Sequence, residues 1–310
     1  MAAKACAKEI SIDTLLDMKD NIGKDYKKIK RIEDELLELQ EMIGNEELKR
    51  KIAEQIIMLI QNLHDTEMLN IALFGPPGTG KTTLAKIIGT IYAKLGHLSE
   101  GNVYIVGRED LIGQYLGETA LKTTEVLENS LGNVLFIDEV YSLGNDDKRD
   151  SFAKECVDTI TKFLSENPKD FLCIIAGYEN EVRKYFFDQN PGLDRRFPFK
   201  FKLNQYNSND LYKIFKHQIY RNKWKFRESE KDKEEMIELF KKHKDRFKNN
   251  GGDTENLLCC CKIAHSVRIF GQKKKQKKCI IMKDIKNGFA AYIENKAEKK
   301  DSTDFMSMYT

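Results

Sequence analysis

Residues 69–82 read LNIALFGPPGTGKT, an apolar run followed by a glycine-rich loop that ends in lysine and threonine. The loop, residues 75–82, matches the pattern G-x-x-x-x-G-K-[ST]. The run before it predicts a buried strand, and the apolar spacing between Leu84 and Leu95 predicts a helix after it. A loop in that setting turns backbone N–H groups towards phosphate oxygens at a helix N-terminus. The stretch therefore predicts a nucleotide site.

Residue types within this loop suit separate tasks. Gly78 and Gly80 let the backbone turn, Lys81 should reach the β- and γ-phosphates, and the Thr82 hydroxyl should ligate Mg²⁺. The predicted cofactors are ATP and Mg²⁺. The residues expected to contact the nucleotide here are Gly75, Pro76, Pro77, Gly78, Thr79, Gly80, Lys81, Thr82 and Thr83.

A second motif, LFIDE at 135–139, ends an apolar run with two acids. Ligands bind at the carboxyl ends of parallel strands, so we expect Asp138 to hold Mg²⁺ through water. Glu139 should orient and polarise the attacking water. Many phosphate-loop kinases and small GTPases lack a glutamate directly after this aspartate, so the pair favours an ATP hydrolase.

Five short apolar runs, separated by helical patterns, predict the fold. They span 69–75, 102–107, 133–140, 171–177 and 197–203. Near-continuous apolar strands between helices indicate a parallel sheet covered on both faces. The last run alternates and therefore predicts an edge strand. The fold class is thus α/β, a parallel five-stranded sheet flanked by helices and followed by an all-helical C-terminal domain.

Helical patterns flank the sheet region. Residues 11–40 have an irregular apolar stripe, and 45–63 form a clearer helix that Asn45 can cap. After 205, helical patterns follow a cap signal at NSND and recur at about 228–247, 253–270 and 284–296. The predicted division is an N-terminal helical segment at 1–40, the α/β domain at 41–204, the helical domain at 205–296 and a disordered tail at 297–310.

The composition of the chain limits which classes of partner are expected. The 52 Lys and Arg face 49 Asp and Glu in 310 residues, a net charge of +3 that does not demand a nucleic-acid or membrane partner. No apolar run approaches a membrane span or a secretory signal. We expect a soluble, intracellular, cytoplasmic protein. The basic run 270–278 is interpreted as a solvated turn, with a nucleic-acid contact as the alternative.

The chain has seven cysteines, and no CxxC pair with a second pair indicates zinc. Cys259, Cys260 and Cys261 lie in a helical pattern, which favours small buried apolar residues over a redox role.

Four stretches together resemble a known family: GPPGTGKTTLAK, LFIDEVYSL, IIAGYENEV and NPGLDRRFPF. They are similar to the AAA+ ATPases, and most closely to the CbbX/CfxQ-like branch, which includes stage V sporulation protein K. The resemblance covers roughly residues 36–296. It identifies the fold as a phosphate-loop NTPase with a C-terminal lid. It also implies a homo-oligomer, a hexameric ring with ATP bound between subunits.

The resemblance assigns further residues. The segment MIGNEELKRKI at 42–52 looks like the one that covers adenine, so Ile43 and Gly44 are expected to line the base pocket, unless they only start a helix. In NPGLDRRF, Arg196 looks like the arginine finger, with Arg195 as second choice. Such a cation from the next subunit neutralises charge on the γ-phosphate in the transition state. The alternative is two solvated arginines at a strand entrance.

Two positions depart from the family. Where many members place Asn or Thr after the fourth strand, this chain has Tyr178, Glu179 and Asn180, and the sequence does not say which acts. Where the lid often carries an arginine that touches phosphate, this chain has Glu255. Either another cation substitutes, with Arg268 a candidate, or the lid senses nucleotide differently.

The stretch DLIGQYLGE at 110–118 follows the second predicted strand. In remodelling motors of this family, an aromatic residue, a hydrophobic residue and glycine in this loop project into a central pore. Tyr115, Leu116 and Gly117 fit that pattern. A tyrosine ring grips many side chains without sequence preference. The alternative is that Tyr115 and Leu116 pack under their own helix.

The leading hypothesis is an ATP-driven motor that remodels an unidentified protein substrate by gripping a polypeptide in its pore. The first alternative is a DNA-associated loader, disfavoured by the near-neutral charge. The second is a nucleotide-regulated scaffold with weak hydrolysis, suggested by the missing lid arginine. Nothing in the sequence identifies Rubisco as a substrate.

Overall fold

The computed structural model describes residues 10–21, 23–63, 68–115, 117–144, 150–271 and 277–307. The chain divides into two compact units. The first holds Met1–Gly75 and Gly80–Asn204, and the second holds Pro76–Thr79 and Gln205–Thr310. Over the described ranges, no helix combines the length and apolar character needed to cross a bilayer.

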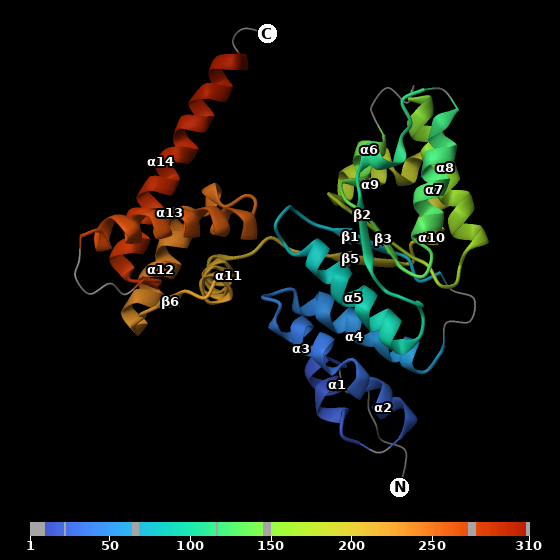
Figure 1. The fold of residues 1–310 in the computed structure, drawn as a ribbon, viewed down its shortest axis with the longest axis horizontal. Coiled ribbons are helices and arrows are strands. Elements are labelled where there is room, and N and C mark those ends of the chain that lie inside the picture. Colours follow the sequence, from blue (N-terminus) through green and yellow to red (C-terminus); the bar gives the residue numbers. More distant parts are fainter. Residues whose placement is uncertain are drawn as a thin grey trace. The chain divides into compact units, whose positions relative to one another are not determined.

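The first unit is built on a five-stranded sheet in which every neighbouring pair is parallel (Figure 1). The strand order is β2-β3-β4-β1-β5. The bounds are β1 Ile71–Phe74, β2 Val103–Val106, β3 Val134–Ile137, β4 Leu172–Gly177 and β5 Phe199–Lys202. The predicted fold class is confirmed, and β5 is an edge strand as its alternating pattern predicts. Strand β4 lies between β1 and β3, which carry the two motifs.

Side chains of successive strand residues enter opposite cores, as the two-residue period requires. In β1, Ile71 and Leu73 pack in one core and Ala72 and Phe74 in the other. The first core is closed by α1 Ile12–Met18, α2 Lys24–Arg31, α3 Glu33–Glu41, α4 Glu46–Ile60 and α5 Lys81–Leu95. The second is closed by α6 Arg108–Leu111, α7 Glu118–Asn129, α8 Ser151–Glu166, α9 Glu179–Tyr185 and α10 Leu193–Arg196, with the short turns η1 Val140–Leu143 and η2 Phe187–Gln189.

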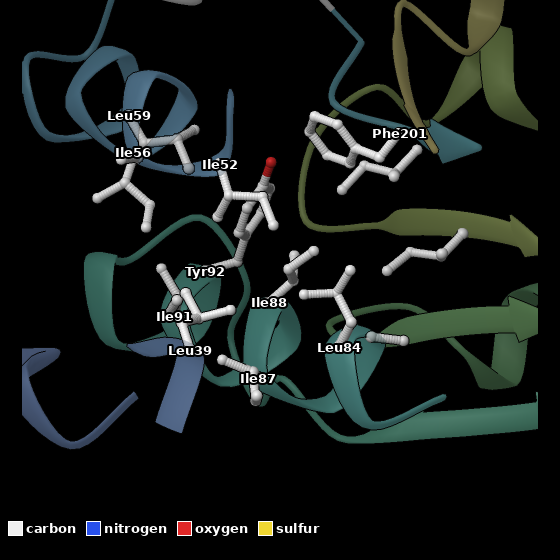
Figure 2. Close-up of a cluster of buried hydrophobic side chains, with 14 of the residues drawn as sticks. Leu39, Ile52, Ile56, Leu59, Leu84, Ile87, Ile88, Ile91, Tyr92 and Phe201 are labelled. Carbon is white, nitrogen blue, oxygen red and sulfur yellow. The ribbon is translucent and has the colours of Figure 1, made fainter. Parts of the chain in front are cut away.

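Figure 2 shows how the first core joins the N-terminal helices to the sheet. Leu39 of α3 and Ile56 of α4 gather with α5 residues such as Ile91. The buried Tyr92 hydroxyl accepts a hydrogen bond from Gln55 Nε2 at 2.7 Å, so its polar end is satisfied inside the core. The helices that precede residue 42 therefore share one core with α5.

The second unit has a largely aromatic core within four helices: α11 Ser208–Arg221, α12 Glu230–Lys242, α13 Gly251–Ile269 and α14 Met282–Ser307. The turn η3 Lys244–Arg246 precedes α13. Two short strands, β6 Lys225–Phe226 and β7 Cys279–Ile280, pair in parallel, so the expectation of helices alone is wrong in this detail. Helix α14 also continues past residue 296, where the sequence analysis placed a disordered tail.

The three consecutive cysteines in α13 differ in environment. Cys261 is buried, Cys260 is intermediate and Cys259 is exposed, so the prediction of three buried residues is wrong for Cys259. Burial raises the pKa of the Cys261 thiol. A Cβ on Gly288 would lie 2.4 Å from its sulfur, so α14 approaches α13 closely because residue 288 is glycine. Most of the basic run 270–278 lies outside the described residues.

Candidate nucleotide site

The phosphate loop joins β1 to α5 as the sequence predicts. Gly80 has φ of 94°, a conformation that suits glycine, and α5 begins at Lys81. The Lys81 ammonium donates to the Gly75 carbonyl oxygen at 3.0 Å. Burial lowers the pKa of Lys81, and the negative charges of Asp138 and Glu139 act in the opposite direction. The lysine and the acid pair therefore interact electrostatically within the first unit.

The acid pair follows β3, where the chain turns into η1. Asp138 Oδ1 accepts the Glu139 N–H at 3.0 Å, and Glu139 has a left-handed backbone with φ of 47°. That conformation is uncommon for a residue with a side chain and is found at functional sites. The Glu139 carbonyl accepts the Ser142 N–H at 2.8 Å, which anchors the turn. The Glu139 side chain is exposed.

Strand β4 brings a third segment to this edge of the sheet. The Gly177 carbonyl at its end accepts the Gly75 N–H at 3.0 Å. The stretch Tyr178–Asn180 therefore begins between the phosphate-loop strand and the acid-pair strand. The Glu179 carboxylate forms ion pairs with both Arg183 and Lys202, each with an N–O distance of 3.0 Å.

Tyr178 is the member of that stretch whose ring packs against Tyr141, two residues after the acid pair. Its ring centroid lies 6.2 Å from that of Tyr141, and it is 41% exposed. A Cβ on Gly177 would lie 2.9 Å from the Tyr141 ring, so the ring rests against the end of β4. Burial, with the charge and a hydrogen bond of Glu139, raises the pKa of Tyr141 to about 12. Tyr141 thus touches both Glu139 and Tyr178.

Sequence reasoning missed Tyr141. The only signal was its place two residues after Glu139 in IDEVYSL. A tyrosine at that place could equally well be a buried core residue.

Tyr141→Phe is expected to lower kcat for ATP about three- to tenfold with little change in KM. It removes the hydroxyl contact to Glu139, and one such hydrogen bond is worth about 1 kcal/mol. Steady-state hydrolysis assays check this. Tyr104→Phe, which changes an exposed tyrosine on β2, is the control. A raised KM with unchanged kcat would contradict this role.

The predicted base-pocket residues lie beside the end of the phosphate loop. The Met42 methyl group lies 3.4 Å from where a Gly80 Cβ would stand, and Ile43 and Gly44 follow it in the turn before α4. Asn45 occupies the N-cap position of α4 as predicted, but its side chain makes no capping hydrogen bond. Its Oδ1 instead accepts the Asn204 N–H at 2.8 Å, which ties this turn to the chain leaving β5.

The two candidate finger arginines have different surroundings. The Arg196 guanidinium donates to Thr161 O at 3.1 Å, Ser165 Oγ at 2.6 and 2.9 Å, and Gly192 O at 2.7 Å. Arg195 is exposed, and its side chain has no hydrogen bond or ion pair within the described part of the chain. The contacts within this chain leave the Arg195 side chain more available than that of Arg196 to act as an arginine finger. The sequence resemblance, in contrast, assigns that role to Arg196.

The loop before α7 exposes its tyrosine. Tyr115 is 70% exposed, which excludes the alternative that it packs under its own helix. The Glu118 carboxylate accepts the N–H groups of Gln114 at 3.3 Å and Tyr115 at 3.1 Å. Gly117 has φ of 85° and is the N-cap residue before α7. Leu116, the second predicted gripping residue, lies outside the described residues.

The lid position is not filled by a cation. Glu255 is exposed on α13. Arg268 pairs with the buried Asp284 at 2.6 Å, near the far end of a 19-residue helix that is about 28 Å long. The proposal that Arg268 substitutes for the missing arginine is therefore wrong, because Gly251, the residue that contacts the phosphate loop, opens that helix.

Comparison with known proteins supports an ATPase. Residues 71–202 match the family model described as "ATPase family associated with various cellular activities (AAA)". Among solved structures, the AAA domain of FIGL-1 in complex with ADP superposes with a TM-score of 0.58 at 17% identity, covering 80% of this chain and 81% of that one. A Thermotoga maritima RuvB mutant gives 0.54 at 18%, covering 82% and 72%. At such identities these likenesses show the fold alone.

Curated relatives are closer in sequence. A putative cfxQ-like protein of Acanthamoeba polyphaga mimivirus is 41% identical over 83% of this chain. Stage V sporulation protein K of Bacillus subtilis is 40% identical over 49% of this chain. The chain spans 64% and 47% of the lengths of these two relatives. A CfxQ homolog of Pyropia yezoensis is 34% identical over 67% of this chain and 68% of its own length. With its phosphate loop, acid pair and sheet order, the chain belongs to the CbbX/CfxQ-like branch of the AAA ATPases.

Proposed function

We propose that this ATPase assembles into a hexameric ring that grips a polypeptide in its central pore and remodels a protein or protein complex. The observation that carries the proposal is Tyr115, an exposed aromatic side chain on a loop whose backbone is fixed by Glu118. An exposed aromatic ring contacts varied side chains at low entropic cost. The protein substrate is not identified by these features.

Hydrolysis would be carried out by the residues at the ends of β1 and β3. The oxygen donors that Mg²⁺ prefers are present in Thr82 and Asp138, and within the described residues only the Glu139 N–H occupies the Asp138 carboxylate. Thr82 would hold Mg²⁺ directly and Asp138 through water. The bound ion would neutralise charge on the transferred phosphoryl group. Lys81 would leave the Gly75 carbonyl to bind the β- and γ-phosphates.

Glu139 would orient the water that attacks the γ-phosphate. Its side chain is exposed, and its left-handed backbone turns it out of the strand direction. Tyr141 and Tyr178 link it to the end of β4, so this pair would do the work that Asn or Thr does in many relatives. Positioning of the reactants and electrostatic stabilisation are the main protein contributions in phosphoryl transfer.

An arginine from the neighbouring subunit would complete the site. Arg196 would have to leave three acceptors in its own protomer, whereas Arg195 would reach a neighbour without such a change. We propose Arg196, from its place directly before Phe197, as the finger and Arg195 as the second candidate. Either would make hydrolysis depend on assembly.

Tyr115→Ala is expected to keep basal ATP turnover within about twofold and to abolish its stimulation by an unfolded polypeptide, since the ring contacts substrate and not nucleotide. Casein, which lacks stable structure, is the probe. Tyr220→Ala removes another exposed tyrosine, from α11, and is the control; its exposed fraction is 48%, against 70% for Tyr115. Equal stimulation of wild type and Tyr115→Ala would sink the gripping proposal while leaving the ATPase assignment intact.

A further inference from the structure

Five successive carbonyl groups of the phosphate loop, from Gly75 to Thr79, each accept a hydrogen bond. The Gly75 carbonyl accepts from Lys81 Nζ at 3.0 Å, and the Pro76 carbonyl accepts from Thr79 Oγ1 at 2.8 Å. Three further donors come from beyond residue 205 within the second unit, which includes Pro76–Thr79. They are Asn250 Nδ2 to Pro77 O at 3.1 Å, Gly251 N–H to Gly78 O at 3.0 Å and Tyr206 Oη to Thr79 O at 2.8 Å.

These bonds also determine where the N–H groups of the loop point. A trans peptide is planar, so its carbonyl and N–H point in opposite directions. Holding the carbonyls of Pro77, Gly78 and Thr79 therefore directs the N–H groups of Gly78, Thr79 and Gly80 away from the donors. Those three N–H groups have no hydrogen-bond acceptor within the described ranges of the chain. They are the groups that a phosphate loop offers to its ligand.

The donors are themselves held in place. Asn250 is fully buried with φ of 47° and ψ of −112°, and its Oδ1 accepts the Tyr206 N–H at 3.4 Å. Asp253 accepts the Asn249 N–H at 2.8 Å, which fixes the turn before α13. A Cβ on Gly78 would lie 2.0 Å from the Asn249 carbonyl, so the loop and this turn are in direct contact.

We propose that Asn250 and Tyr206 are positioning residues that preset the phosphate-binding N–H groups and link nucleotide binding to the second unit in place of a lid arginine. Phosphate bound to the N–H side of a peptide polarises the carbonyl on the other side, which strengthens the bonds to Asn250 and Tyr206. The coupling is reciprocal: if bound nucleotide strengthens these hydrogen bonds by a given factor, then losing the bonds weakens nucleotide binding by that factor. The inference concerns the ATPase itself and does not depend on polypeptide gripping.

Tyr206→Phe tests the proposal because it removes one hydroxyl and keeps the buried ring. We expect the Kd for ADP, measured by calorimetry, and the KM for ATP to rise about three- to tenfold, the loss of one hydrogen bond. The kcat at saturating ATP should stay within about twofold. Tyr212→Phe is the matched control, because the Tyr212 hydroxyl donates to Glu228 in the same unit and not to the loop.

Asn250→Asp is the second variant, since it replaces the donor to Pro77 with a carboxylate oxygen of the same size. We expect the Kd for ADP to rise at least about tenfold, because an acceptor would then face an acceptor. The melting temperature without nucleotide shows whether each variant folds. Unchanged ADP affinity in folded Tyr206→Phe, or an equal loss in Tyr212→Phe, would overturn the proposal.

Discussion

Glu139→Gln is expected to lower ATP turnover by about 10²- to 10⁴-fold while nucleotide binding is retained. A glutamine keeps the size of the side chain and loses the carboxylate that we propose polarises the attacking water. We expect the phosphate contacts to come from other residues, Lys81 and the loop, so affinity for ATP should change little. The variant should therefore hold ATP, and any bound polypeptide, for longer than the wild type.

Single-turnover hydrolysis and ATP binding, measured on the same preparation, check this expectation. Glu125→Gln, an exposed glutamate on α7, serves as the control and should behave as wild type. Equal turnover of Glu139→Gln and wild type would show that the site is not a working hydrolase. The nucleotide-regulated scaffold would then be the better interpretation.

Arg196→Ala is expected to reduce turnover about 10³-fold or more, the usual loss for an arginine finger. It also removes hydrogen bonds to Thr161, Ser165 and Gly192, so the melting temperature should fall as well. The stability loss alone could reduce activity, and a second measurement is needed to separate the two effects.

Mixing inactive subunits supplies that measurement. Lys81→Ala subunits lack a working phosphate loop but retain Arg196, whereas Arg196→Ala subunits have the reverse defect. If the arginine acts on the next subunit, the mixture should regain turnover that neither variant shows alone. The same pair of assays with Arg195→Ala is the control. Recovery with Arg195→Ala and not with Arg196→Ala would move the role to Arg195.

The sequence predicts the parts of this molecule that depend on local pattern. Apolar runs predicted each sheet strand, and alternation predicted β5 at an edge, because burial on one or both faces dictates residue type along a strand. The strands β6 and β7 are too short to leave such a pattern. Asn45 was expected to cap α4 because asparagine often does. Its side-chain oxygen instead accepts a hydrogen bond from the distant Asn204 N–H.

The site was predictable where its residues are adjacent in the chain and not where they are distant. The phosphate loop and acid pair are contiguous motifs. Tyr141 carries no distinguishing signal, because its role depends on the ring lying against Gly177. The bond between Asn250 and Pro77 joins residues 173 positions apart, and no local pattern encodes it.

The placement of Pro76–Thr79 in the second unit has a consequence for how the chain can be cut or recombined. The two units are interleaved and are not modules in series, since the chain enters the second unit at the phosphate loop and again after Asn204. A fragment ending at Asn204 would leave the carbonyls of Pro77, Gly78 and Thr79 without their donors. A graft of another C-terminal portion must likewise supply an amide, a backbone N–H and a hydroxyl at those three places.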